Sequence, residues 1–489
     1  MSTENNIERI KGFNYVKKHF DQIISSYKNQ SLLEERNVSL NNNLILYGPE
    51  GHGKTFMASC LFEELENLDY EVIEVIPELK DDKENESCDH GWKALLSSYT
   101  VCSEISELDD CLDNIICKGD VDSFDEKVCF FFDNLEKYIS DEKEQLREDV
   151  DNIFQYISRL QSSCKKYIVV GICNSESIPD TWPYFGIFEN QLHIEETSFN
   201  DRKEIISQLL SEINYGKVNV DDITSMISSE YTYKKIRTLI QNAELISVNE
   251  SYDKTMKISD EEKATYFIVE AFNDMEFGVD MIDFSGSKED IVEAATHEAG
   301  HAVVGHILNP GSVSFISISR VGRNDSDADG SIYYEYPFNM LDKICRCLGS
   351  IASVELKLHS HAFGTSGDLT KSVIYAEHLV KNLAHCGLSL VSTGLDSVTQ
   401  ELSKNQEVAI HNLLQEQYIR AKMIVQSNAT LLDFISDELL RKGYIFKSEI
   451  QKFCEENGIK AFSDDNVLAT SIFNKDSNRL FSEQGIHRN

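Results

Sequence analysis

Two histidines four residues apart are the residues in this sequence best placed to do chemistry. His297, Glu298 and His301 form the pattern His-Glu-x-x-His. Residues four apart on a helix lie on the same face, one turn apart, so both imidazoles can bind one metal ion. Glu298 is then close enough to take a proton from a water molecule at that ion. The alternative interpretation is a helix with two ordinary histidines.

The surrounding residues predict the helix that this pattern requires. Residues 287–308 contain no proline, and Ser287 with Asp290 is typical of a helix start. A catalytic zinc site also needs a third protein ligand, with the fourth position left to water. Asp368 is one candidate, although it could instead cap a helix. Spacing alone does not choose between Asp368 and its rivals, which are Glu355, His306, His359 and His361.

A glycine-rich stretch near the N-terminus matches a phosphate-binding loop. An apolar strand at 44–47 leads into the pattern G-x-x-x-x-G-K-T, and a helix follows. In such a loop the backbone N–H groups surround phosphate oxygens, the lysine adds charge and the threonine hydroxyl binds Mg²⁺. The residues assigned to ATP are Gly48, Pro49, Glu50, Gly51, His52, Gly53, Lys54 and Thr55.

Two later apolar strands are each expected to end beside this loop. Asp133 follows the strand at 128–132 and is expected to help hold Mg²⁺ through water. Asn174 ends the strand at 167–174, where it either touches the γ-phosphate or caps a loop. Asn134 stands where most motor ATPases have a glutamate that polarises water, and asparagine cannot act as a base. Glu136 is expected to point elsewhere if the strand at 128–132 continues.

The composition favours a soluble globular protein with few anionic partners. The 489 residues include 83 Asp and Glu against 46 Lys and Arg, a net charge of −37. This balance disfavours nucleic acid and anionic membranes as partners. The 12 cysteines form no Cys-x-x-Cys pair, as expected for small core residues in a reducing compartment. Neither a signal peptide nor a long apolar span is visible, which predicts a cytoplasmic protein.

Taken together, these motifs resemble those of the FtsH family of AAA+ zinc metalloproteases. The resemblance extends from about residue 8 to about residue 458 and is strongest in the second half of the chain. The stretches that carry it are Ile10–Lys17, Gly48–Thr55, Thr296–Val304, Leu348–Glu355 and Thr365–Leu369. In this family an Asp of the last stretch is the third zinc ligand. The resemblance therefore assigns that role to Asp368 and a secondary role near the metal to Glu355.

The resemblance implies an α/β P-loop AAA+ domain with a helical lid, followed by a mostly α-helical zinc metallopeptidase domain. The expected ranges are 1–200 for the nucleotide-binding domain, 201–255 for the lid, 256–286 for a linker, 287–460 for the peptidase and 461–489 for a flexible tail. The implied cofactors are Zn²⁺, ATP and Mg²⁺. The implied function is protein degradation by a zinc metalloendopeptidase coupled to an ATP-binding module. The alternative is a non-enzymatic nucleotide-binding regulator or scaffold derived from the same family.

Several features depart from the family pattern. Asn134 replaces the catalytic glutamate, and residues 180–189 lack the arginines that a neighbouring subunit contributes in this family. No aromatic-x-Gly pore loop is found, and the chain begins at the ATPase module instead of at transmembrane helices. ATP binding is therefore expected to survive, hydrolysis to be weak, and the homo-hexamer of the family to be less certain. The strand at 313–319 is expected to pair with an extended protein or peptide substrate.

Overall fold

A computed structural model gives the fold of the chain. It describes residues 6–36, 43–76, 99–102, 107, 127–139, 151–159, 167–178, 185–213, 215–249, 258–277, 288–319, 329–334, 339–360, 365–383, 385 and 400–460. Contacts divide the chain into two compact units. Unit 1 comprises residues 1–214 and 228–238, and unit 2 comprises residues 215–227 and 239–489.

Unit 1 is built on a parallel sheet whose described strands lie in the order β3-β2-β4-β5-β1-β6. These strands are β1 (Leu44–Tyr47), β2 (Glu71–Val75), β3 (Tyr99–Cys102), β4 (Val128–Phe132), β5 (Tyr167–Cys173) and β6 (Asn190–His193). Strands β4 and β5 are buried along their whole length. Continuous apolar strands of this kind are typical of a parallel sheet that is covered on both faces. The strands predicted at 44–47, 128–132 and 167–174 are confirmed.

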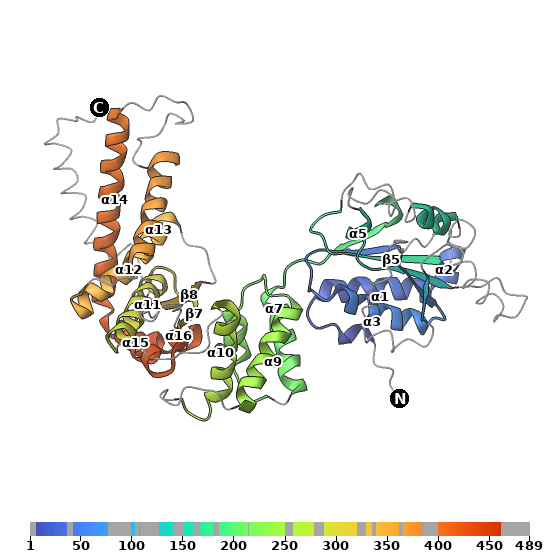
Figure 1. Cartoon of the computed structure of the whole chain (residues 1–489), viewed down its shortest axis with the longest axis horizontal. Helices are drawn as coiled ribbons and strands as arrows, with labels where there is room; N and C mark the ends of the chain where they lie inside the picture. Colours follow the sequence, from blue (N-terminus) through green and yellow to red (C-terminus); the bar gives the residue numbers. More distant parts are fainter. Residues whose placement is uncertain are drawn as a thin grey trace, which may run out of the picture. The chain divides into compact units, whose positions relative to one another are not determined.

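Helices α1 and α3 lie along one face of this sheet (Figure 1). The helices of unit 1 are η1 (Asn6–Arg9), α1 (Asn14–Lys28), α2 (Gln30–Glu35), α3 (Lys54–Glu66), α5 (Glu136–Ile139), η3 (Phe185–Ile187) and α7 (Phe199–Glu212). Most of the polar stretch 80–125, predicted as a loop followed by a helix, lies outside the described residues. The part of it that is described includes β3, which pairs with β2.

Unit 2 is mostly helical. Its helices are α8 (Val220–Met226), α10 (Lys263–Phe277), α11 (Lys288–Leu308), α12 (Met340–Leu358), α13 (Thr365–Glu377), η4 (His378–Asn382), α14 (Gln400–Ser427), α15 (Ala429–Lys442) and α16 (Lys447–Asn457). Helix α9 (Tyr233–Asn249) begins in unit 1 and ends in unit 2. Helix α11, which carries the His-Glu-x-x-His pattern, contributes apolar residues to one large core with α12, α14 and α15.

A small antiparallel sheet packs against α11, in the described order β8-β7-β9. Its strands are β7 (Val313–Ser319), β8 (Asp329–Tyr334) and β9 (Tyr444–Phe446). Strand β7 is central, because β8 pairs along it from Val313 to Ser319 and β9 pairs with residues 315–317 on its other side. Strand β7 is therefore not the free edge that pairing with a substrate needs, because residues 315–317 are paired on both sides.

The range predicted as a linker, 256–286, contains the packed helix α10. Phe272 of α10 lies edge-on to Phe315, with ring centroids 5.8 Å apart, and Tyr266 lies 6.5 Å from Tyr444. The apolar run of α10 accounts for the difference, because these side chains are buried against the small sheet. Helix α8, from the range predicted as the lid, also contacts β7.

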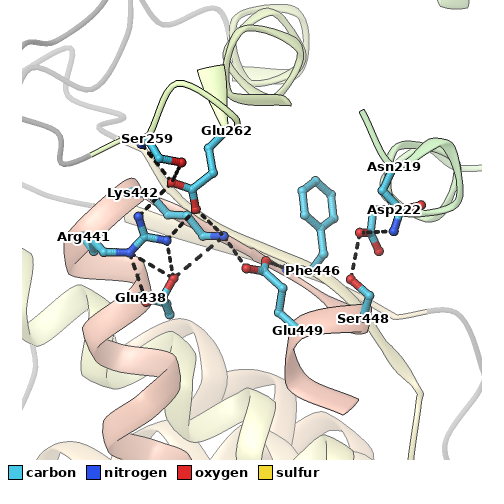
Figure 2. A network of polar contacts seen from close by, with 10 residues as sticks. All are labelled: Asn219, Asp222, Ser259, Glu262, Glu438, Arg441, Lys442, Phe446, Ser448 and Glu449. Carbon is cyan, nitrogen blue, oxygen red and sulfur yellow. Dashed lines mark hydrogen bonds and ion pairs between the residues drawn. The ribbon is translucent and has the colours of Figure 1, made fainter. Parts of the chain in front are cut away.

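Polar contacts fix these two segments to the C-terminal part of unit 2 (Figure 2). Arg441 donates to both oxygens of Glu262 at 2.7 and 3.0 Å, and also to Glu438. Hydrogen bonds from Arg441 lower the pKa of Glu262 to about 2, so this carboxylate stays charged at neutral pH. Ser448 donates to Asp222 of α8 at 2.7 Å. Segments far apart in the sequence are thereby joined in one unit.

Candidate metal and nucleotide sites

The structure brings the side chains of His297, His301 and Asp368 together. Their candidate ligand atoms lie within 4.8 Å of one another, and no other such group of three is found among the described residues. The histidines lie one turn apart on α11, and Asp368 lies in the first turn of α13. The Nε2 atoms of His297 and His301 lie 3.0 and 2.9 Å from the same oxygen, Oδ2 of Asp368.

The tautomer of His301 fits a metal ligand. Its Nδ1 lies 2.9 Å from the backbone carbonyl oxygen of Arg346. A carbonyl only accepts hydrogen bonds, so Nδ1 carries a proton and Nε2 is the ring nitrogen that faces Asp368. A lone pair facing a carboxylate oxygen at 2.9 Å requires a proton or a cation shared between them. A divalent metal ion meets this requirement, and metal-binding histidines usually donate from the other ring nitrogen to a carbonyl in this way.

Asp368 is held by groups that keep its carboxylate ionised and oriented. Burial by itself raises the pKa of Asp368, but the two imidazoles outweigh this effect and hold the pKa well below its ordinary value. Ser350 of α12 donates from Oγ to Oδ2 of Asp368 at 3.2 Å. Arg346 contributes only its backbone carbonyl, so its residue type gave no signal in the sequence, and the role of Ser350 appears only when α12 packs beside α13.

Glu298 lies beside the first histidine on α11. Its side chain is buried, with 6% exposed, as is that of His301. Glu298 follows His297 directly and precedes His301 by three residues on the same helix, which is the position from which the glutamate of this motif can take a proton from a water molecule.

The rival ligands lie elsewhere, among the residues that the structure describes. Glu355 accepts hydrogen bonds from Tyr418 and, at 2.6 Å, from Lys422, both of α14. These contacts join α12 to α14, and Glu355 does not belong to the metal group, so its secondary role near the metal stays a prediction. His306 and His359 do not belong to the metal group, and His361 lies outside the described residues.

The metal-site helix lies very close to α12 at two glycines. A Cβ built on Gly300 would lie 2.2 Å from Oγ of Ser353 and 2.5 Å from the carbonyl oxygen of Gly349. Ser353 uses this close approach to donate from Oγ to the carbonyl oxygen of Thr296 at 2.9 Å. The glycines thus set the distance between the helix carrying the histidines and the helix carrying Ser350.

We expect Gly300→Ala to destabilise the protein by about 1–3 kcal/mol, because its methyl group must push α11 and α12 apart. Denaturant unfolding measures this free energy of unfolding. Gly367→Ala is the matched control: nothing lies within 4 Å of a Cβ at Gly367, which is exposed on α13. That control should stabilise by about 0.4–1 kcal/mol. Equal effects of the two substitutions would contradict the close approach.

The phosphate-binding loop lies between β1 and α3. Gly48 has φ of 137°, and a Cβ there would lie 2.3 Å from the carbonyl oxygen of Ile194, so only glycine fits. Lys54 begins α3, and its ammonium group donates to the carbonyl oxygens of Gly48 and Pro49 at 2.9 and 2.7 Å. His52 is buried within the loop, with Nδ1 3.3 Å from the carbonyl oxygen of Pro49. In the sequence between these residues, Glu50 is exposed and Gly51 and Gly53 have positive φ.

Sheet order brings the ends of three strands beside this loop. Strands β4, β5 and β1 are parallel neighbours, so Asp133, Asn174 and Gly48 follow strands at the same edge. Oγ1 of Thr55 donates to Oδ2 of Asp133 at 3.3 Å. A hydroxyl and a carboxylate in contact are hard oxygen donors of the kind that Mg²⁺ prefers.

Asn174 is bound to side chains that follow β4. Its Nδ2 donates to Oδ1 of Asn134 at 3.0 Å and to Oε1 of Glu136 at 3.1 Å. Its backbone N–H donates to Oε2 of Glu136 at 2.8 Å. The expectation that Glu136 points elsewhere is wrong, because the strand ends at Phe132 and the chain turns.

Comparisons with known proteins found one matching family and several similar proteins. Residues 44–196 match the family described as ATPase family associated with various cellular activities (AAA). The ATP-dependent zinc metalloprotease FtsH of Karelsulcia muelleri is 24% identical over 281 residues, which cover 54% of this chain and 44% of that protein. The protein of the same name from Parabacteroides distasonis is 22% identical over 474 residues, 90% of this chain and 63% of that protein. The chain thus spans about half to two thirds of the length of these relatives.

One solved structure, a crystal structure of the FIGL-1 AAA domain in complex with ADP, aligns with a TM-score of 0.38 and 16% identity over 55% of this chain and 84% of that chain. The AAA match and the helical unit 2 confirm the predicted fold class. In the part of the chain that the structure describes, none of the helices has the length and apolar character needed to cross a lipid bilayer.

Proposed function

We propose that this chain is an FtsH-like AAA+ protein, a zinc metalloendopeptidase that cleaves proteins and is coupled to an ATP-binding module. The observation that supports the peptidase is the convergence of His297, His301 and Asp368 on one point, with Glu298 beside them on α11. Two imidazoles, one carboxylate and a neighbouring glutamate form the residue set of a catalytic zinc site.

In this proposal His297, His301 and Asp368 would hold Zn²⁺, which would supply a Lewis acid for a water molecule and the scissile carbonyl. Glu298 accepts a proton from the attacking water and later gives it to the leaving amine. The carbonyl of Arg346 fixes the tautomer of His301, and Ser350 orients Asp368. Because of these contacts, the side chains of His301 and Asp368 are already oriented before the reaction begins.

The nucleotide part of the proposal rests on the loop at 48–55. Its backbone N–H groups surround the phosphates of ATP, and Lys54 adds positive charge. Thr55 and Asp133 are suited to hold Mg²⁺, directly or through water, because their oxygens lie 3.3 Å apart. Asn174 follows β5 at the same edge of the sheet, but its Nδ2 donates to Asn134 and Glu136, so its contact with the γ-phosphate stays a prediction. The homo-hexamer and the cytoplasmic location stay predictions.

Metal analysis and a protease assay test the proposal together. We expect one equivalent of zinc per chain and cleavage of an unfolded protein substrate, measured with and without ATP. A chelator should abolish cleavage, and added Zn²⁺ should restore it, because the ion is bound by only three side chains. Zinc far below one equivalent with no cleavage would instead support a non-enzymatic nucleotide-binding regulator or scaffold.

A further inference from the structure

The chain turns sharply after β4, and this turn decides where Glu136 lies. Asn134 has φ of 57°, in the left-handed region that asparagine tolerates better than most residues. Its N–H donates to Oδ1 of Asp133 at 2.8 Å. The next residue, Leu135, is fully buried, and its N–H donates to the carbonyl oxygen of Ile172 at 2.8 Å. The strand therefore does not continue, and Glu136 begins α5 beside the end of β5.

The carboxylate of Glu136 is held firmly at this position. Both of its oxygens accept hydrogen bonds from Asn174, at 2.8 Å from the backbone N–H and 3.1 Å from Nδ2. A carboxylate has about four acceptor positions, so each oxygen keeps one for a further donor. Asn174 thus orients Glu136 without exhausting its capacity to accept a proton.

The charge of Glu136 acts at the phosphate-binding loop. Lys54 is 3% exposed, and burial lowers the pKa of its ammonium group. The carboxylate of Glu136 opposes this effect more strongly than any other charge, including that of Asp133. Glu136 follows β4 and Lys54 follows β1 at the same edge of the sheet, so this charge acts on the group that meets the β- and γ-phosphates of a bound nucleotide.

We propose that Glu136 is the general base for ATP hydrolysis in this chain and takes the place of the glutamate that position 134 lacks. This inference rests on the proposed binding of ATP at the loop 48–55. The oxygen of a water molecule bonds to the γ-phosphorus, and the bond from that phosphorus to the oxygen of ADP breaks. Glu136 accepts the proton from the water and passes it to the released phosphate. Asn134 supplies no base and instead accepts from Nδ2 of Asn174.

Glu136→Gln in the full chain tests this role. We expect the wild-type protein to release phosphate from Mg²⁺–ATP, and the variant to have a kcat at least about 10²-fold lower. The dissociation constant of a fluorescent ATP analogue should change little, because Glu136 is not part of the loop 48–55. Lys137→Gln is the matched control, since Lys137 is the next residue on α5 and is exposed. The control should hydrolyse ATP at the wild-type rate.

Two results would overturn the inference: an unchanged kcat in Glu136→Gln, or a wild-type protein that binds ATP without turning it over. If Glu136→Gln fails to bind ATP, Glu136→Asp decides between a local structural role and a base. That variant keeps a carboxylate but withdraws it by one methylene group. A lower kcat with unchanged ATP affinity supports the base, and a wild-type kcat refutes it.

Cleavage of a short unstructured peptide, which needs no unfolding, separates this inference from the proposed peptidase. Zinc-dependent cleavage without ATP hydrolysis would support the proposed peptidase and refute the role of Glu136. ATP hydrolysis that depends on Glu136, in a protein that contains no zinc, would support the role of Glu136 and refute the peptidase. A wild-type protein that does not bind ATP would refute the nucleotide part of the proposed function, and the role of Glu136 with it.

Discussion

Glu298→Gln is expected to reduce peptide cleavage by about 10²–10⁴-fold while leaving zinc binding intact. Glutamine has nearly the same shape as glutamate but cannot accept the proton from the attacking water. The three side chains that converge on the metal position are unchanged in this variant. The loss corresponds to about 3–5 kcal/mol of transition-state stabilisation. Initial rates on a fluorogenic peptide and the zinc content of the same preparation measure the two quantities.

Glu289→Gln is the matched control for this experiment. Glu289 lies on the same helix, but its side chain is exposed. The control should cleave at the wild-type rate and contain the same amount of zinc. Normal cleavage by Glu298→Gln would exclude Glu298 as the proton acceptor. Loss of zinc together with activity would mean that Glu298 supports the metal site instead.

Asp368→Asn is expected to weaken zinc binding by more than about 100-fold. Losing a residue that only hydrogen-bonds to a metal ligand costs about 10–100-fold, and the loss of a ligand should cost more. The substitution keeps the size of the side chain but removes the negative charge on which both Nε2 atoms converge. The affinity can be measured by competition with a chromophoric chelator. Peptide cleavage should fall in proportion to the zinc lost at a fixed free zinc concentration.

Glu355→Gln is the comparison that tests whether Asp368 or Glu355 is the third metal ligand. Glu355 was the alternative carboxylate near the metal, but its partners are Tyr418 and Lys422. Because Glu355 is not one of the three converging side chains, its substitution should cost much less zinc affinity than Asp368→Asn, and it should weaken the α12–α14 contact. A larger loss of zinc affinity in Glu355→Gln than in Asp368→Asn would reverse the assignment of the third ligand.

Local sequence patterns predicted the two metal-site histidines and the phosphate-binding loop, because each lies within one short segment of the chain. The relative position of His297 and His301 follows from one helix, and the loop at 48–55 from one strand–loop–helix segment. Asp368 lies 67 residues from His301, so spacing could not select it, and only the family resemblance did. Physical signals of its role appear when α11, α12 and α13 pack and bring Ser350 to its carboxylate.

The predictions that were wrong depended on contacts that the sequence does not display. Glu136 was expected to point elsewhere if β4 continued, but β4 ends at Phe132 and Asn134 adopts a left-handed conformation. Strand β7 was expected to have a free edge, but β9 pairs with it from about 130 residues further along the chain. Helix α10 fell in a range chosen as a linker from its position between motifs, although its aromatic residues already indicated burial.

The way α10 is anchored limits how this protein can be truncated. An expression fragment that starts at 287 would lack Tyr266 and Phe272, and it would leave the aromatic faces of Tyr444 and Phe315 open to water. Arg441 would also lose its carboxylate partner Glu262. The chain changes unit after residues 214, 227 and 238, so no single cleavage point yields both units intact. Such a fragment is expected to aggregate, and its inactivity would say nothing about the metal site.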